Sequence, residues 1–402
     1  MSTKDLGPGV LQHTSELTVD PHRLSGLRLG TLAFALFVVG TNAFVVAGVL
    51  PAIGDSLSVT PTLVSYAISA YAILVAVLAP AFSMLLAHIP PERVMAAGML
   101  TFAVGTGVSA IAPTYLVFFI ARALAGVGAA ALVPLATALA PRLAEPGRQG
   151  RAMAVVALGF TLAVALGSPV GTGLAEITNW RVAIGGLAVL GAVLGLTMAT
   201  LLRGVPTNPK VSLAARMRVL ADPRVVMGVI AIMMMIMSFN LIYVFSSEVT
   251  SAVTGGDGAI LALLLLVFGL AGAVGNQLGG WLIDTWGDLR TMRIALVAEI
   301  AAFLLMLLTL ESLAGTALVF ALWGVSGFAS VVALQHRLAS LRPEHSAIVL
   351  SWYSTGMYVG ISLAPVIGAA VLLSHGPLGL AVSAALAAAV ALVMTVPVRS
   401  RS

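Results

Sequence analysis

The sequence predicts an all-α membrane protein with twelve transmembrane helices in two pseudo-symmetric six-helix bundles. Three observations support this fold class. Of the 402 residues, 60% are hydrophobic and only 9% are charged, against roughly 25% charged in typical soluble domains. Apolar stretches of about 20 residues, the length that crosses a bilayer as a helix, recur from Leu29 onwards. Finally, Lys and Arg residues gather in alternate connections, and the two halves of the chain resemble each other.

Each apolar stretch is expected to be a helix, because lipid offers no hydrogen-bond partner to an unpaired backbone group. The polar first residues precede the first stretch and contain no apolar run long enough for a signal peptide. In chain order, we expect the twelve spans at 29–53, 62–87, 94–112, 115–140, 151–175, 181–202, 225–253, 259–283, 291–310, 314–338, 346–373 and 378–398.

The positions of the basic residues predict the orientation of the chain. Short loops rich in Lys and Arg stay in the cytoplasm, and 18 of the 20 Lys and Arg residues lie in the termini or in every second loop. The exceptions are Arg122, inside the fourth span, and Arg181, at the start of the sixth. We therefore expect both termini in the cytoplasm. The same distribution explains the net charge of +5 without nucleic-acid binding.

A proline-containing polar loop divides the spans into two sets of six. We expect a cytoplasmic arm, an N-terminal bundle, a cytoplasmic linker, a C-terminal bundle and a cytoplasmic tail, at 1–28, 29–202, 203–224, 225–398 and 399–402.

The two sets of spans are expected to be repeats of one another. Arg28 and Arg224 are 196 residues apart, as are Pro169 and Pro365. Parallel repeats about an axis normal to the membrane are typical of transporters that bind their substrate near the midplane.

Several other classes of protein are excluded by missing residues. The chain has no Cys, which excludes disulfides and thiolate metal sites. Its six His residues are scattered over tails and loops, and no Gly-x-x-x-x-Gly-Lys-Ser/Thr loop is present to cradle a phosphate. We expect no catalytic residues, no metal and no cofactor.

Four motifs carry a family resemblance. They are a loop signature at Gly280-Trp-Leu-Ile-Asp284-Thr-Trp-Gly287-Asp-Leu-Arg290, a fourth-span signature at Arg122-Ala-Leu-Ala-Gly126-Val-Gly128, a fifth-span set of Gly159, Gly167, Pro169, Gly171 and Gly173, and the first-span segment Gly40 to Asp55. From residue 28 to 398 the chain resembles the major facilitator superfamily. The first-span segment is similar to its twelve-helix drug:proton antiporter branch, especially chloramphenicol-resistance and arabinose-type sugar exporters.

The resemblance implies a secondary transporter of the bacterial cytoplasmic (inner) membrane that works as a monomer and takes a small-molecule substrate, protons and the lipid bilayer as its partners. It implies export of a small amphipathic compound, such as an amphenicol-like antibiotic, by proton antiport. The branch places a carboxylate before the phenylalanine of the first span, where this chain has Ala43 after Asn42. A sugar or nucleoside exporter or facilitator with weak or no proton coupling therefore stays an alternative, as does a non-transporting sensor or scaffold.

Three buried ionisable residues are candidates for proton coupling. Arg122 lies about eight residues into its span, where a charge is costly and is normally functional, although it could instead be a structural hub joined to Asn42. Glu299, near mid-depth of the ninth span, could instead be a neutral acid with a structural hydrogen bond to an adjacent helix. Glu248 lies near the outer end of the seventh span, which lines the cavity in the family, or simply reaches water there.

The resemblance assigns two further roles. Asp284, Gly287 and Arg290 are expected to form a cytoplasmic gate. The glycines of the fifth span and Pro169 are expected to give close helix packing and a bend.

Residues three or four apart share one face of a helix, and polar positions on such faces predict a substrate cavity. As a set they favour an uncharged or weakly charged ligand. The candidate cavity residues are Asn42, Phe44, Tyr66, Ser69, Met237, Asn240, Tyr243, Asn276, Gln277, Ser354 and Tyr358.

Overall fold

The computed structural model describes residues 21–145, 148–205, 213–309 and 311–395, and nearly all of this part of the chain is helical. Eleven helical stretches in it are long and apolar enough to cross a membrane, which confirms the predicted fold class. The elements are α1 (Pro21–Gly48), α2 (Leu50–Leu57), α3 (Pro61–Leu85), α4 (Pro91–Ala110), α5 (Tyr115–Leu139), η1 (Ala140–Arg142), α6 (Gln149–Leu162), the π-helical η2 (Ala163–Gly167), α7 (Ser168–Ile177), α8 (Trp180–Leu201), α9 (Leu213–Val219), α10 (Pro223–Val244), α11 (Ser246–Val249), α12 (Ser251–Thr254), α13 (Gly258–Trp286), α14 (Asp288–Thr309), α15 (Leu313–Leu341), η3 (Pro343–His345) and α16 (Ser346–Met394).

The predicted span 346–373 and most of the predicted span 378–398 lie within the one element α16, which ends at Met394; residues 396–398 lie outside the described residues. The backbone of α16 leaves helical geometry at Gly376, where φ is +67° and ψ is −167°. A positive φ is a conformation that glycine adopts without steric cost, and Pro377 follows directly. The chain thus turns at this one residue, and the two predicted spans lie on either side of it.

Two other predicted spans end earlier than expected. The first, 29–53, is replaced by α1, which begins at Pro21 and ends at Gly48, and by the short α2. Pro51 has no N–H for the carbonyl of residue 47, so the first helix cannot continue through it. The seventh, 225–253, ends as α10 at Val244 and continues as α11 and α12.

The predicted terminal and linker segments are only partly described. Residues 1–20 of the predicted arm, 206–212 of the predicted linker and the whole predicted tail, 399–402, lie outside the described residues. In the described part, the arm already contains the start of α1, and the linker contains α9.

Most spans begin where the sequence places a capping residue. The side-chain oxygens of these residues accept a hydrogen bond from a backbone N–H in the first turn of the helix, which has no partner within the helix itself. The capping residues are Thr60, Thr114, Asn179, Asp222, Asp257 and Ser312.

Close helix approaches repeat between the two halves of the chain. A Cβ added at Gly40 would lie 2.7 Å from Ala163, and one added at Gly360 would lie 3.2 Å from Ile236. Ile236 follows Gly40 by 196 residues, and Gly360 follows Ala163 by 197.

Two further contacts follow the same relation. A Cβ added at Gly159 would contact the carbonyl of Ala33, and one added at Gly356 would contact that of Val229. In the same way, a Cβ at Gly171 would contact Val45, and one at Gly368 would contact Leu241. The first and fifth spans of each six-span half therefore run parallel to each other, and glycine lets their backbones touch.

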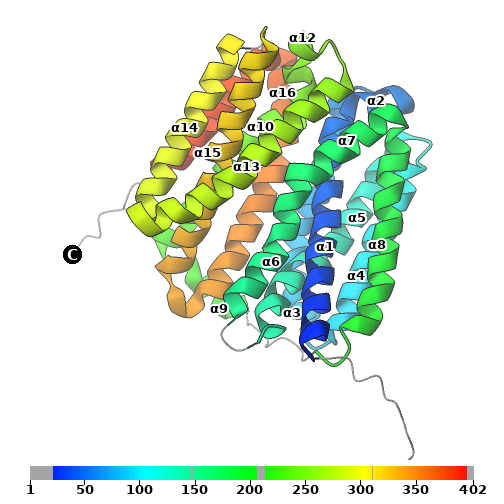
Figure 1. Cartoon of the computed structure of the whole chain (residues 1–402), viewed down its shortest axis with the longest axis vertical. Helices are drawn as coiled ribbons and strands as arrows, with labels where there is room; N and C mark the ends of the chain where they lie inside the picture. Colours follow the sequence, from blue (N-terminus) through cyan, green and yellow to red (C-terminus); the bar gives the residue numbers. More distant parts are fainter. Residues whose placement is uncertain (1–20, 146–147, 206–212, 310, 396–402) are drawn as a thin grey trace, which may run out of the picture.

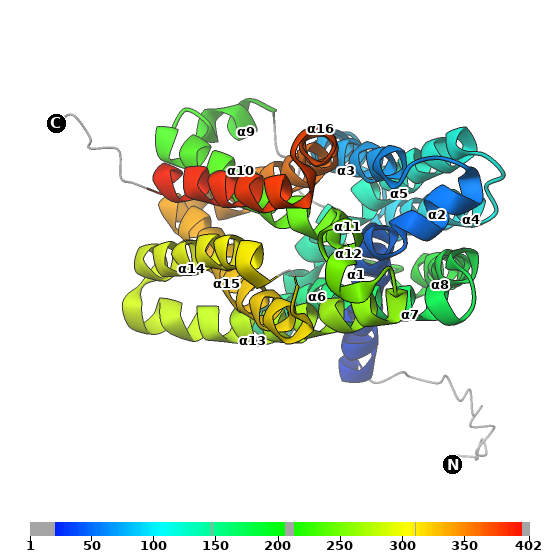
Figure 2. The same ribbon diagram turned by 90° about the horizontal axis from the view of Figure 1, so that it is seen from above.

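The loops lie at two ends of the molecule. We call the end with the α3–α4, α5–α6 and α8–α10 connections the basic face, and the end that carries α2, α11 and α12 the opposite face (Figure 1). Seen along the helices, α3 lies beside α16 on one flank, and α7 lies beside α13 on the other, with α1 between them (Figure 2).

The two halves touch on both flanks of α1, where α7 meets α13 and α3 meets α16. A Cβ at Gly269 of α13 would lie 2.7 Å from the Ala165 carbonyl oxygen of η2, and Gly173 of α7 lies near Ala262. On the other flank, Ser69 of α3 donates a hydrogen bond of 2.7 Å to the carbonyl of Ser362 in α16. These contacts close the centre of the molecule from the opposite face.

Candidate functional site

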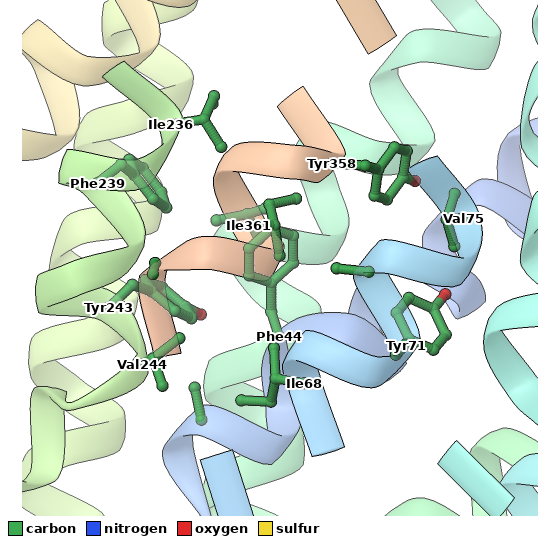
Figure 3. Packing of buried hydrophobic residues seen from close by; sticks show 14 of the residues in the cluster. Phe44, Ile68, Tyr71, Val75, Ile236, Phe239, Tyr243, Val244, Tyr358 and Ile361 are labelled. Atoms are coloured by element: carbon green, nitrogen blue, oxygen red, sulfur yellow. The ribbon is translucent and has the colours of Figure 1, made fainter. Parts of the chain in front are cut away.

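A small cavity lies between α1, α3, α10 and α16, and Phe160 of α6 adds to its lining. Figure 3 shows how Phe44, Tyr243 and Ile361 pack in this region. The volume of the cavity is about 10 Å³, which is room for roughly one water molecule. A larger ligand can therefore enter only after side chains move. The lining is apolar apart from one amide and three phenol groups, and consists of Val39, Ala43, Phe44, Ala47, Ile68, Tyr71, Phe160, Asn240, Tyr243, Val244, Tyr358 and Ile361.

The structure brings four of the predicted cavity residues together in this lining: Phe44, Asn240, Tyr243 and Tyr358. The others do not line it. Asn42 and Met237 are buried elsewhere in α1 and α10, Ser69 is bonded to α16, Tyr66 and Asn276 are half-buried, Gln277 is exposed on α13, and Ser354 donates to the Leu350 carbonyl of its own helix.

Tyr243 joins the two halves across this cavity. Its hydroxyl donates a hydrogen bond of 2.7 Å to Ser168 Oγ at the start of α7, and its ring stands edge-on to that of Phe44, with 5.3 Å between ring centroids. Asn240, one turn away, donates from Nδ2 to the Ile236 carbonyl of its own helix at 2.8 Å. The cavity wall on α10 is thus held by bonds to both halves.

Arg122 is fully buried in α5, with none of its surface exposed to solvent. Its guanidinium carbon lies 4.8 Å from the centroid of the Tyr71 ring, an arrangement in which the ring face attracts the cation. None of its three side-chain nitrogens has a hydrogen-bond partner among the described residues. Gly126, one turn along α5, faces the backbone of Tyr71, so α3 and α5 touch at this level.

Sequence reasoning missed Tyr71, which both contacts Arg122 and lines the cavity. The signal that could have identified it is its depth. Tyr71 lies ten residues into α3, and a phenol at mid-depth in a membrane helix needs a polar partner. In Figure 3 it projects from α3 towards the side of the cavity that holds Tyr358 of α16.

The two carboxylates proposed for proton coupling lie apart from this cavity. Glu299 of α14 is fully buried, and one of its oxygens accepts a hydrogen bond of 3.2 Å from Ser330 of α15 while the other has no partner among the described residues. Glu248 is half-buried in α11, near the opposite face.

The predicted gate residues lie at the α13–α14 corner of the basic face. Asp284 and Arg290 are exposed, and no ion pair joins them in the described part of the chain. Gly287 has a φ of +81°, which explains a glycine at this turn. The acid that is paired here is Asp288, whose carboxylate lies 3.5 Å from Arg337 and 3.5 Å from His336 of α15.

The glycines of the fifth span pack against α1, except Gly173, which faces α13. Gly159, Gly167 and Gly171 meet Ala33, Thr41 and Val45 in turn. Pro169 cannot donate to the Ala165 carbonyl. The chain forms the π-helical turn η2 just before it, with the Ser168 N–H bonded to the Ala163 carbonyl.

Known proteins resemble this chain over most of its length. A sequence model described as Major Facilitator Superfamily matches residues 32–365 and 228–402. An uncharacterized MFS-type transporter of Bacillus subtilis strain 168, YbcL, is 27% identical over 84% of this chain and 86% of its own length. The inner membrane transport protein YdhP of Escherichia coli K12 is 28% identical over 85% of this chain and 87% of its own.

A solved structure shares the fold. It is a bacterial homolog of the human lysosomal transporter Spinster in an inward-facing and unoccupied conformation, which aligns with a TM-score of 0.71 and 15% identity over 92% of this chain and 97% of its own.

Proposed function

The chain belongs to the Major Facilitator Superfamily of membrane transporters, and on that premise we propose that it exports a small amphipathic compound in exchange for protons. The observation that carries this proposal is the contact between the buried Arg122 and Tyr71, a residue of the cavity wall. A buried guanidinium beside a binding cavity is sensitive to any change of charge there. It is therefore suited to couple occupancy of the cavity to the movement of a proton.

The proposed cycle is a rocking of residues 29–202 against 225–398 around the central cavity. If Lys- and Arg-rich loops face the cytoplasm, the closed opposite face is the outer face of the membrane. Breaking the contact of Gly269 with η2 and the hydrogen bond of Tyr243 to α7 would open the outer face. In the opposite state, Asp284 and Arg290 at the basic face would close the cytoplasmic side.

The second candidate function is an exporter or facilitator of a sugar or nucleoside-like metabolite without proton coupling. Ala43 favours it, because this residue lines the cavity at the position where the resembling branch has a carboxylate. Such a protein would equilibrate its substrate but could not concentrate it.

Dye-reported proton movement in everted membrane vesicles separates the two. Amphenicols, aromatic acids, sugars and nucleosides are added in turn to vesicles that carry the chain or its Arg122→Ala variant. Proton antiport predicts that one class dissipates the proton gradient in the wild type and not in the variant. Equilibration of a labelled compound with no proton movement would establish the facilitator instead.

A further inference from the structure

The surroundings of Arg122 lack the negative charge that a buried cation requires. Moving an isolated charge out of water is costly unless it is paired and hydrogen-bonded. Arg122 has the Tyr71 ring on one face and no acceptor for any of its side-chain nitrogens among the described residues. A cation–π contact is worth about 0.5 to 2 kcal/mol, which does not offset the burial of a full charge.

Among the residues that the structure describes, no carboxylate of the N-terminal half is placed to neutralise Arg122. In the described part of this half, the Asp and Glu residues all lie at helix ends or in loops, namely Asp55, Glu92, Glu145 and Glu176. Arg122 lies eight residues inside α5. The fully buried carboxylate of the other half, Glu299, is bonded to Ser330.

The unpaired polar groups near this end of the cavity are mostly donors. The guanidinium offers five N–H groups and each phenol one O–H. The buried hydroxyl of Tyr71, a residue of the cavity lining, has no partner among the described residues. Tyr358 of α16 lines the same side of the cavity as Tyr71 of α3. A surplus of donors around a cation is complementary to an anionic group rich in acceptors.

We propose that the Tyr71 end of the cavity is an anion subsite, and that the substrate is an amphipathic compound with a single negative charge. The Tyr71 side chain moves aside, and the acidic group of the substrate binds Arg122 and the two phenol hydroxyls. The hydrophobic body then lies against Ile68, Phe44 and Ile361. A second negative charge would find no partner, because Arg122 is the one Lys or Arg in the middle of a described span.

This inference rests on the proposed function for its substrate class, but it is tested by binding alone. The full-length protein is purified in a buffer free of chloride and of carboxylates, and its melting temperature is followed by tryptophan fluorescence. The probes are acid and amide pairs of equal shape, phenylacetate with phenylacetamide and 4-phenylbutyrate with 4-phenylbutyramide, at millimolar concentration. Because a ligand that binds only the folded state raises the melting temperature, neither transport nor a proton gradient is needed.

The variants isolate the charge of Arg122. Arg122→Gln removes it and Arg122→Lys keeps it. The matched control is Arg181→Gln, because Arg181 also lies over an aromatic ring, 4.4 Å from Trp180, but its guanidinium donates to the carbonyls of Ala110 and Ala112.

In the wild type and in Arg181→Gln, we expect at least one acid to raise the melting temperature more than its amide does. The difference should be smaller in Arg122→Lys and absent in Arg122→Gln. Chloride added alone identifies the source of the anion. If it gives the same Arg122-dependent shift, the subsite stands but takes a free inorganic anion. Equal shifts from acid and amide, a shift that survives in Arg122→Gln, or no shift from any acid or from chloride would overturn the proposal.

Discussion

The contact between Gly269 and Ala165 predicts a variant that changes the conformation without touching the cavity. A Cβ at residue 269 would lie 2.7 Å from the Ala165 carbonyl oxygen and closer still to its Cα, where ordinary contacts are 3.4–4 Å. In Gly269→Ala the helices α13 and η2 must therefore separate by roughly 1 Å, and such overpacking typically costs about 1 to 3 kcal/mol.

This cost falls on the conformation in which the opposite face is closed. If the two halves rock, the helices are apart at this point in the other state, and a penalty of about 2 kcal/mol shifts the equilibrium towards that state about 30-fold. Gly280→Ala in the same helix is the matched control, because a Cβ there meets nothing within 4 Å.

The shift is measurable by distances between spin labels, since the chain has no Cys of its own. Labels at Thr178→Cys and Ala252→Cys, both exposed at the opposite face, should move apart in Gly269→Ala and not in Gly280→Ala. A lower melting temperature with an unchanged distance distribution would refute the reasoning, because the contact would then be common to both states.

Three further predictions concern single side chains. Arg122→Leu should raise the melting temperature in the absence of ligand, because it removes an unpaired buried charge. It should also lower substrate-driven proton movement at least tenfold. A lower melting temperature would mean that the charge of Arg122 is already compensated. Glu299→Gln keeps an acceptor for Ser330, and residue 299 lies outside the cavity lining. We therefore expect proton movement in vesicles to stay within about twofold of wild type. Loss of proton movement in this variant would assign the coupling proton to Glu299. Tyr243→Phe removes the hydrogen bond to Ser168, which is worth about 0.5 to 1.5 kcal/mol. This variant should lengthen the distance between the labels at residues 178 and 252 less than Gly269→Ala does. If Ser168→Ala adds no further change to Tyr243→Phe, the two residues act as a pair.

The spans and the internal repeat could be predicted because both depend on the order of residues along the chain and not on contacts between helices. Apolar length locates a membrane helix whatever its neighbours are, and the 196-residue offset between Arg28 and Arg224 reappears in the contacts of Ala33 and Val229. The turn at Gly376 could not be predicted to occupy a single residue, because two apolar stretches separated by a few residues predict a short loop between them.

The cavity was only partly predictable because it depends on how helices are rotated and how closely they pack. The face of α10 that carries Asn240 and Tyr243 does line it, but Met237, one turn earlier, does not. At that level Gly360 brings α16 against the backbone of Met237, which leaves no space in front of it. The partnership of Arg122 with Tyr71 joins two different helices, and no spacing within either one encodes it.

The central claim, export driven by protons, is tested most directly by accumulation in liposomes that contain only this protein. The labelled compound that gives the largest response in vesicles is offered outside, with an acidic interior that drives protons outward. Proton antiport predicts that the compound accumulates inside above its equilibrium level, and that Arg122→Leu abolishes the excess. Equilibration to the same level with and without the pH gradient would contradict the account.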